Sequence, residues 1–136
     1  MKSDLAPRFF YYINLIGLFI SLVFIAVIHQ KTMDLALETQ EFVPFILTSI
    51  FGTVVMLLIG FSINRVRYIT INPASEDKFI MGNLLSNSLV SASELRILKK
   101  VWMKNMYKIN VSGKNYYMLT HNRTVEEFKH NTDFKK

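Results

Sequence analysis

FFYYINLIGLFISLVFIAVI, residues 9–28, is an apolar run of twenty residues without a charged side chain. A second such run, VPFILTSIFGTVVMLLIGFSI, occupies residues 43–63, and only fourteen residues, 29–42, separate the two. An α-helix rises about 1.5 Å per residue, so each run is long enough to cross a hydrocarbon core of roughly 30 Å. The first run exceeds the roughly 7 to 15 apolar residues of a signal peptide. The sequence therefore predicts a transmembrane helical hairpin, with spans at about residues 9–28 and 43–63.

Charge is distributed unevenly along the chain, whose formal net charge is +6. Residues 64–136 carry 13 Lys and Arg against 6 Asp and Glu, whereas the loop 29–42 carries one Lys against three acidic residues. Lys and Arg are favoured in cytoplasmic segments that flank membrane spans. Arg8 before the first run, with Arg65 and Arg67 after the second, therefore predicts that both termini are cytoplasmic.

Small and polar residues interrupt both apolar runs. Asn14 is the most polar of them, Gly17 and Ser21 lie four residues apart, and Gly52 and Gly60 occupy the second run. Small residues at this spacing let another helix approach closely, and an amide can hydrogen-bond across the contact. Two interpretations give these residues a role, namely packing within the hairpin and a homo-oligomer interface. Neither run contains Asp, Glu, Lys, Arg or His, which argues against an ion or proton path through this chain alone.

Residues 64–136 differ in character from the preceding 1–63 and predict a separate, β-rich domain. The expected strands, which alternate or are β-branched, are residues 67–72, 78–85, 106–111 and 115–121. The last two flank a short turn at Gly113 and predict a hairpin. Gly82 suggests a bulge or bend, and residues 86–93 are expected to be a loop. Thr124, followed three residues later by Glu127, predicts the start of a terminal helix.

The segment ELRILKKVWMKNM, residues 94–106, permits two interpretations. As a helix it is amphipathic and basic, and would suit an anionic lipid surface with Trp102 of its apolar face at the membrane interface. As a strand it would carry lysines at a sheet edge. Trp102, Tyr107 and Tyr117 are expected to pack in the fold. The candidate residues for contact with lipid or a partner are Arg65, Arg67, Lys99, Lys100, Trp102 and Lys104.

The order of these features resembles small bacterial two-transmembrane proteins with a cytoplasmic PH-like domain. The resemblance is carried by RYITIN, ELRILKKVWM, the YKINV-SGK-NYYML hairpin and the EEF segment. It implies that ELRIL is a strand, and that the domain is a PH-like antiparallel sheet with a C-terminal helix. It also implies a bacterial inner-membrane protein whose module docks a protein partner or an anionic membrane surface, in one version as an accessory subunit of a larger membrane complex. Residues 64–136 are short for such a domain, so strands should be short or missing.

No catalytic, metal-binding or cofactor-binding motif is recognisable. The chain has no cysteine, and its five glycines are dispersed rather than gathered in a phosphate-binding loop. His29, with Asp34 and Glu38 nearby, offers too few ligands for a metal site and is expected to be solvated. We therefore expect no enzyme activity, cofactor or metal. The basic charge could suit nucleic acid, but tyrosines at hairpin spacing more often pack a sheet, so no nucleic-acid partner is expected.

The expected partners are membrane lipids, together with a protein partner or further copies of this chain. An alternative function belongs to a different class. In that alternative, residues 64–136 sense a small ligand, and the two spans then oligomerise and permeabilise the membrane.

Overall fold

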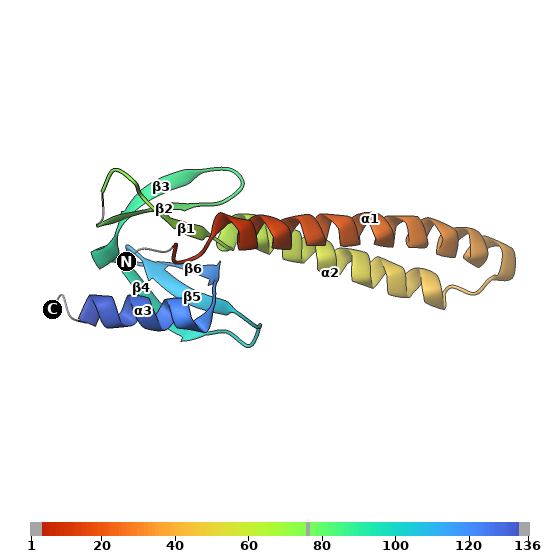
Figure 1. Ribbon diagram of the computed structural model, residues 1–136. Helices are drawn as coiled ribbons and strands as arrows, with labels where there is room; N and C mark the ends of the chain where they lie inside the picture. Colours follow the sequence, from red (N-terminus) through yellow and green to blue (C-terminus); the bar gives the residue numbers. More distant parts are fainter. Residues whose placement is uncertain (1–3, 76, 134–136) are drawn as a thin grey trace. The chain divides into compact units, whose positions relative to one another are not determined.

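The structure, a computed structural model, describes residues 4–75 and 77–133. It divides into two compact units (Figure 1). The helical unit contains Ile13–Ser62, and the β unit contains the described residues of 1–12 and of 63–136. The boundary expected from the sequence fell between residues 63 and 64. The structure differs from it because residues 4–12, which precede or begin the first apolar run, belong to the β unit.

The helical unit consists of parts of two long helices, α1 (Arg8–Thr39) and α2 (Val43–Arg65). Both are long and apolar enough to cross a membrane. Helix α1 begins directly after Pro7, as its fixed φ favours, and continues far beyond residue 28. The segment MDLALET consists mostly of good helix formers, so most of the expected loop is helical. The chain turns at Gln40, whose φ of 60° ends the helix.

The two helices pack along a seam of shielded residues that recur at alternating spacings of three and four. In α1 these are Leu15, Leu18, Leu22, Ile25, His29, Thr32 and Ala36; in α2 they are Phe45, Thr48, Gly52, Val55, Ile59 and Ser62. Such a 3.5-residue repeat is typical of knobs-into-holes packing. The His29 Nδ1 lies 2.8 Å from the Thr48 hydroxyl, and its ring stacks on Phe45. The expectation of a solvated His29 is therefore wrong, because α1 extends past it.

The β unit contains two three-stranded antiparallel sheets, ordered β1-β2-β3 and β4-β5-β6. The strands are β1 (Tyr68–Ile71), β2 (Lys78–Gly82), β3 (Asn87–Ser91), β4 (Leu95–Lys100), β5 (Met106–Val111) and β6 (Lys114–Leu119). A short 3-10 helix, η1 (Ala92–Glu94), connects β3 to β4, and α3 (Asn122–Asp133) follows β6. A parallel bridge between Val66 and Tyr117 links the two sheets.

Both sheets and α3 contribute to one hydrophobic core. Val125 and Phe128 of α3 are buried in it, and the Phe128 ring lies 6.0 Å from that of Phe79. The strands supply Ile69, Phe79, Met81, Val90, Leu95, Tyr107, Ile109, Val111 and Met118. Helix α3 begins at Asn122, two residues before the expected N-cap at Thr124.

Residues 4–6 complete this core from the other end of the chain. Ala6 forms an antiparallel bridge with Ile69, through hydrogen bonds of 2.9 and 2.8 Å between their backbone groups. The Asp4 carboxylate accepts a 2.9 Å hydrogen bond from the Ile71 N–H. Leu5 is completely buried. Residues 4–6 are therefore joined to β1 by this single bridge and by the Asp4 hydrogen bond.

Two sequence interpretations are corrected by the strands. The helix interpretation of residues 94–106 is wrong, because Leu95 and Ile97 alternate toward the core and pair with Val111 and Ile109 of β5. A register shift after Ile97 leaves Leu98 exposed. The loop expected at residues 86–93 is also wrong, because it contains β3. The other four expected strands are confirmed: β5 has the expected bounds, β1 and β2 are shorter, and β6 begins one residue earlier and ends two residues earlier than expected.

Gly82 forms part of a regular β ladder opposite Tyr68, and the expected bulge is absent from this pairing. The Tyr68 ring lies across the glycine, so that a Cβ built on Gly82 would be 2.5 Å from the Tyr68 hydroxyl oxygen. The ring is held on its other sides by the Arg8 guanidinium, 5.0 Å from its centre, and by the Tyr11 ring at 5.8 Å. The glycine is therefore required by a close side-chain approach.

Candidate membrane-surface loops

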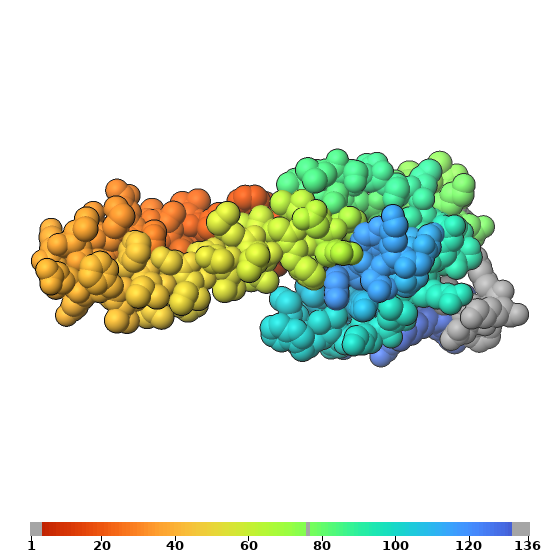
Figure 2. All heavy atoms as spheres, turned by 180° about the vertical axis from the view of Figure 1, so that it is seen from behind, coloured from red at the N-terminus to blue at the C-terminus, as the bar shows by residue number. Residues whose placement is uncertain are grey.

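The loop between β4 and β5 presents the only tryptophan of the chain to solvent. Trp102 is 91% exposed, and its neighbour Met103 is also exposed. Hydrogen bonds from Val101 N to Met106 O and from Met106 N to Met103 O close the loop, and Asn105 adopts a φ of 61°. The expectation that Trp102 packs in the fold is therefore wrong, because β4 ends before it. In Figure 2 the β4–β5 region (turquoise) forms an outer edge of the β unit.

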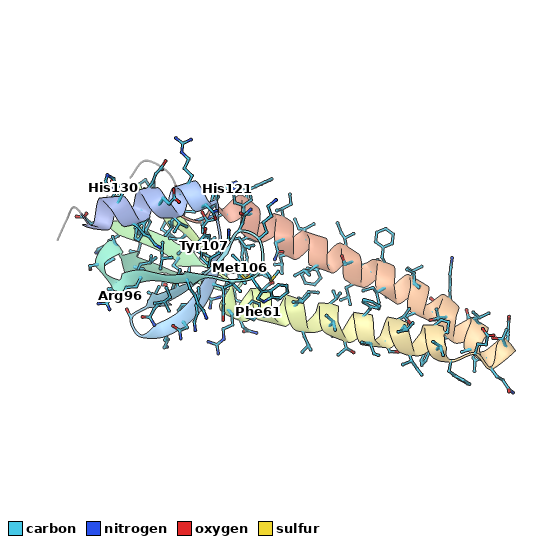
Figure 3. All side chains as sticks on the ribbon, turned by 90° about the horizontal axis from the view of Figure 1, so that it is seen from below. Phe61, Arg96, Met106, Tyr107, His121 and His130 are labelled. Carbon is cyan, nitrogen blue, oxygen red and sulfur yellow. The ribbon has the colours of Figure 1, made fainter. Side chains whose placement is uncertain are left out.

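Lysines flank this tryptophan on both sides. Lys99, Lys100 and Lys104 are all exposed, and the Lys100 Nζ also donates a 3.2 Å hydrogen bond to the Asn122 side-chain oxygen. The Tyr107 hydroxyl donates to the same oxygen, at the start of α3 (Figure 3). Burial, and secondarily the Glu126 carboxylate, raises the pKa of Tyr107. All three lysines are therefore exposed charges beside the loop, and Lys100 and Tyr107 also connect β4 and β5 to the start of α3.

The same loop lies beside the first turn of α1. Phe10 makes an edge-to-face contact with His121, with ring centres 5.0 Å apart. A cavity of about 150 Å³ is lined by Phe10, Lys104, Asn105, Leu119, Thr120 and His121. Because Phe10 also begins the first apolar run, the Trp102 loop lies close to the point where that run starts.

The two arginines at the end of α2 and just after it, Arg65 and Arg67, do not belong to the Trp102 loop. Arg65 is exposed in the last turn of α2. Arg67 is half-buried, its Nη1 donates to the carbonyls of Ile63 and Val66, and its guanidinium covers the Tyr116 ring at 4.8 Å. Burial lowers the pKa of Arg67, which nevertheless stays charged because arginine titrates far above neutral pH. The six candidate contact residues therefore form two groups, and the Arg67 side chain serves the fold.

A second exposed loop was missed by the sequence interpretation. The turn between β2 and β3, residues 83–86, presents Leu84 and Leu85, which are 45% and 74% exposed. The signal in the sequence is a pair of adjacent leucines between turn-forming residues, in a stretch, 79–91, that contains no charged residue. Adjacent exposed leucines at a hairpin tip favour contact with another apolar phase.

The small and polar residues of the helical unit also separate into two groups. The Asn14 amide reaches the Ser62 hydroxyl at 3.5 Å, and a Cβ on Gly52 would touch Ile25 at 3.4 Å. These residues contribute to packing within the hairpin. Gly17 has open space around it, and the exposed Ser21 hydroxyl donates to the Gly17 carbonyl within the same helix. A Cβ on Gly60 would likewise meet open space.

Among residues 4–75 and 77–133, no three His, Asp or Glu side chains gather as they would around a metal ion. Comparison of the chain with protein-family models, with curated proteins and with solved structures found no match.

Proposed function

We propose that this chain is a two-span protein of a bacterial inner membrane whose β unit rests on the anionic cytoplasmic surface through its β4–β5 loop. The observation that carries the proposal is a tryptophan 91% exposed between outward-facing lysines. Tryptophan prefers the membrane–water interface. A lysine close to an anionic leaflet contributes about 1 kcal/mol of attraction. The loop therefore combines the two side-chain types that a lipid headgroup layer attracts.

The pairing of residues 4–6 with β1 supports this topology. Ala6 precedes α1 and Ile69 follows α2, and the two residues are hydrogen-bonded to each other. If both helices cross a bilayer, their outer flanks must then lie on the same side of it. Arg8 and Arg65, which immediately flank the two apolar runs, favour the cytoplasm as that side.

The β unit is proposed to be a non-catalytic, PH-like interaction module. Two small antiparallel sheets followed by a C-terminal helix support this interpretation. A module anchored by two spans is held permanently at the surface, so even a weak contact with lipid acts at high effective concentration. Its role would be to orient a docking surface toward a protein partner, as an accessory subunit of a larger membrane complex.

The single tryptophan provides a direct test in the full-length protein. In nanodiscs made of phosphatidylglycerol and phosphatidylcholine, we expect brominated lipid chains to quench Trp102 fluorescence. Lys99→Gln/Lys104→Gln should weaken the contact by roughly 30-fold, from about 1 kcal/mol per lysine. The matched control is Lys78→Gln/Lys114→Gln, which removes two exposed lysines elsewhere on the β unit and should leave quenching unchanged.

Varying the salt concentration and the lipid charge distinguishes an electrostatic contact of the Trp102 loop with lipid from mere closeness of the loop to the bilayer. Quenching of Trp102 should fall when the phosphatidylglycerol is replaced by phosphatidylcholine, and when salt screens the lysines. If Trp102 stays fully solvated in anionic nanodiscs, the surface contact does not exist. Equal effects of the two double substitutions would show that only net charge matters.

A second candidate function rests on the outward face of α1. Gly17 and Ser21 are not covered by α2, so this face is available to a second copy, as the oligomerising membrane effector would require. In that case native mass spectrometry in mild detergent should show a homo-oligomer. Gly17→Leu/Ser21→Leu should dissociate it, and Ala26→Leu, also at an exposed position of α1, should not. A monomeric wild-type protein would exclude this candidate.

A further inference from the structure

We propose that the β2–β3 tip, residues 83–86, is a second membrane contact, which inserts Leu84 and Leu85 into the acyl-chain boundary of the bilayer that holds the two helices. This inference rests on the proposed function for the presence of that bilayer. It assigns a different chemistry to a different loop, because the tip carries no lysine and presents two exposed leucines, Leu84 and Leu85.

The tip is free of charge over an unusual length. Residues 79–91, which include most of β2 and all of β3, contain no Asp, Glu, Lys or Arg in a chain with 26 such residues. Hairpin tips in water are normally polar, because turns face solvent. Here the two most prominent side chains are Leu84 and Leu85, which are both exposed. The composition is the one expected of a loop that faces lipid.

The four backbone N–H groups of the tip are all hydrogen-bonded within the protein. The N–H groups of Leu85 and Ser86 donate to the Asn83 side-chain oxygen at 3.0 and 2.8 Å, and the Asn83 N–H donates to the Ser86 carbonyl at 2.9 Å. The Leu84 N–H donates to the Tyr11 hydroxyl at 3.1 Å. All four N–H groups are therefore satisfied without water. This matters because an unpaired backbone donor is costly in hydrocarbon.

The tip is also tied to the residues where both apolar helices meet the β unit. The Asn83 side-chain amide donates a 2.7 Å hydrogen bond to the Ile63 carbonyl near the end of α2. The Tyr11 hydroxyl, which accepts from Leu84, belongs to the second turn of α1. The tip is thus hydrogen-bonded to one residue near the start of the first apolar run and to the last residue of the second, both of which belong to the β unit. The membrane that surrounds those runs is the apolar phase within reach of the tip.

The two loops should then differ in depth. The β4–β5 loop carries lysines, which keep its Trp102 at the headgroup level. The β2–β3 tip has no charge to hold it in water and no unpaired N–H to oppose its entry. We expect Leu85 to lie deeper than Trp102, and its contact to depend little on lipid charge or salt.

Relocating the single tryptophan tests this inference in the full-length protein. In a Trp102→Phe background, Leu85→Trp places the fluorophore at the tip, and Ser93→Trp places it in η1, an exposed position at the opposite end of β3. Nanodiscs contain lipids brominated at shallow or deep chain positions. We expect a blue-shifted, strongly quenched spectrum for the tip variant in both phosphatidylcholine and phosphatidylglycerol, and a solvated, unquenched spectrum for the control.

The outcomes separate this inference from the proposed function. Quenching of native Trp102 without quenching at position 85 would overturn the tip insertion and leave the basic loop in place. Quenching at position 85 without that of Trp102 would support the tip and remove the basic loop. Absence of both would overturn both proposals. Leu85→Trp replaces an exposed side chain, and unchanged circular dichroism will confirm that the variant is folded.

Discussion

Gly82→Ala should destabilise the β unit by about 3 kcal/mol, the upper range for inserting a carbon into a packed site. The new Cβ would lie 2.5 Å from the Tyr68 hydroxyl oxygen, 2.6 Å from its Cζ and 3.0 Å from the Asn87 Cβ. Tyr68 cannot simply rotate away, because it is buried and Arg8 and Tyr11 hold its ring. Urea denaturation in mild detergent, followed by hydrogen exchange of β5 and β6, would measure the loss.

A double-mutant cycle tests the cause of this loss. In a Tyr68→Val background the ring is gone, and Gly82→Ala should then cost much less, because only the 3.0 Å approach to the Asn87 Cβ remains and alanine restricts the unfolded chain more than glycine does. The two substitutions should therefore show a large coupling energy. An equal cost of Gly82→Ala in both backgrounds would show that the backbone, not the tyrosine ring, requires glycine.

Leu5→Ala should cost about 3 kcal/mol of the same unfolding free energy, as is typical for a truncated core leucine. Leu5 is 0% exposed and belongs to the core cluster, although it lies outside the strands and α3. The matched control is Leu89→Ala on β3, where the side chain is 60% exposed and little should change. The same denaturation measurement compares both variants with the wild type.

The Leu5 prediction extends to fragments of the chain. A fragment that begins at residue 63 lacks Leu5, the Ala6–Ile69 bridge and the Asp4 hydrogen bond to Ile71. It should show poorly dispersed amide resonances, and adding residues 4–12 through a linker should restore them. Equal stability of the fragment with and without these residues would contradict the assigned role of the segment.

Features that depend on local sequence were predicted well. The composition and length of the two apolar runs are sufficient to predict their helices. The β5–β6 hairpin follows from alternation on both sides of Gly113, whose φ of +83° is one that glycine adopts readily. Each of these signals lies within a short stretch of the chain, so periodicity alone is sufficient to find it.

Features that depend on distant partners were missed. Strand β3 has only one buried side chain, Val90, and its asparagine and two serines are typical of a loop. It is a strand because β2 lies beside it. The pairing of Ala6 with Ile69, and the approach of Tyr68 to Gly82, also join residues that no local pattern connects. Gly82 was therefore predicted to mark a bulge or bend, although in the structure a glycine is needed there because the Tyr68 ring packs against it.

The two candidate loops also combine features that local sequence predicts with features that depend on the fold. The lysines around Trp102 were identified from composition. That they lie beside one exposed loop depends on where β4 ends, and the sequence of 94–106, which permits a helix or a strand, does not show where that is. Leu84 and Leu85 were overlooked because their stretch was assigned to a strand. Leu84 and Leu85 are exposed because they lie in a tight turn. The Asn83 side-chain oxygen closes this turn by accepting hydrogen bonds from the Leu85 and Ser86 N–H groups.

The discontinuous β unit has a consequence for the order of events during synthesis. Ala6 leaves the ribosome sixty-three residues before Ile69, the residue with which it pairs. At roughly 5 to 20 residues per second, this delay amounts to several seconds. Both apolar helices are made during that interval, so in the proposed two-span topology they can enter the bilayer before the β unit has a complete core. Residues 4–6 stay unpaired with β1 until α2 has been synthesised, and their docking onto β1 is therefore a late step of folding.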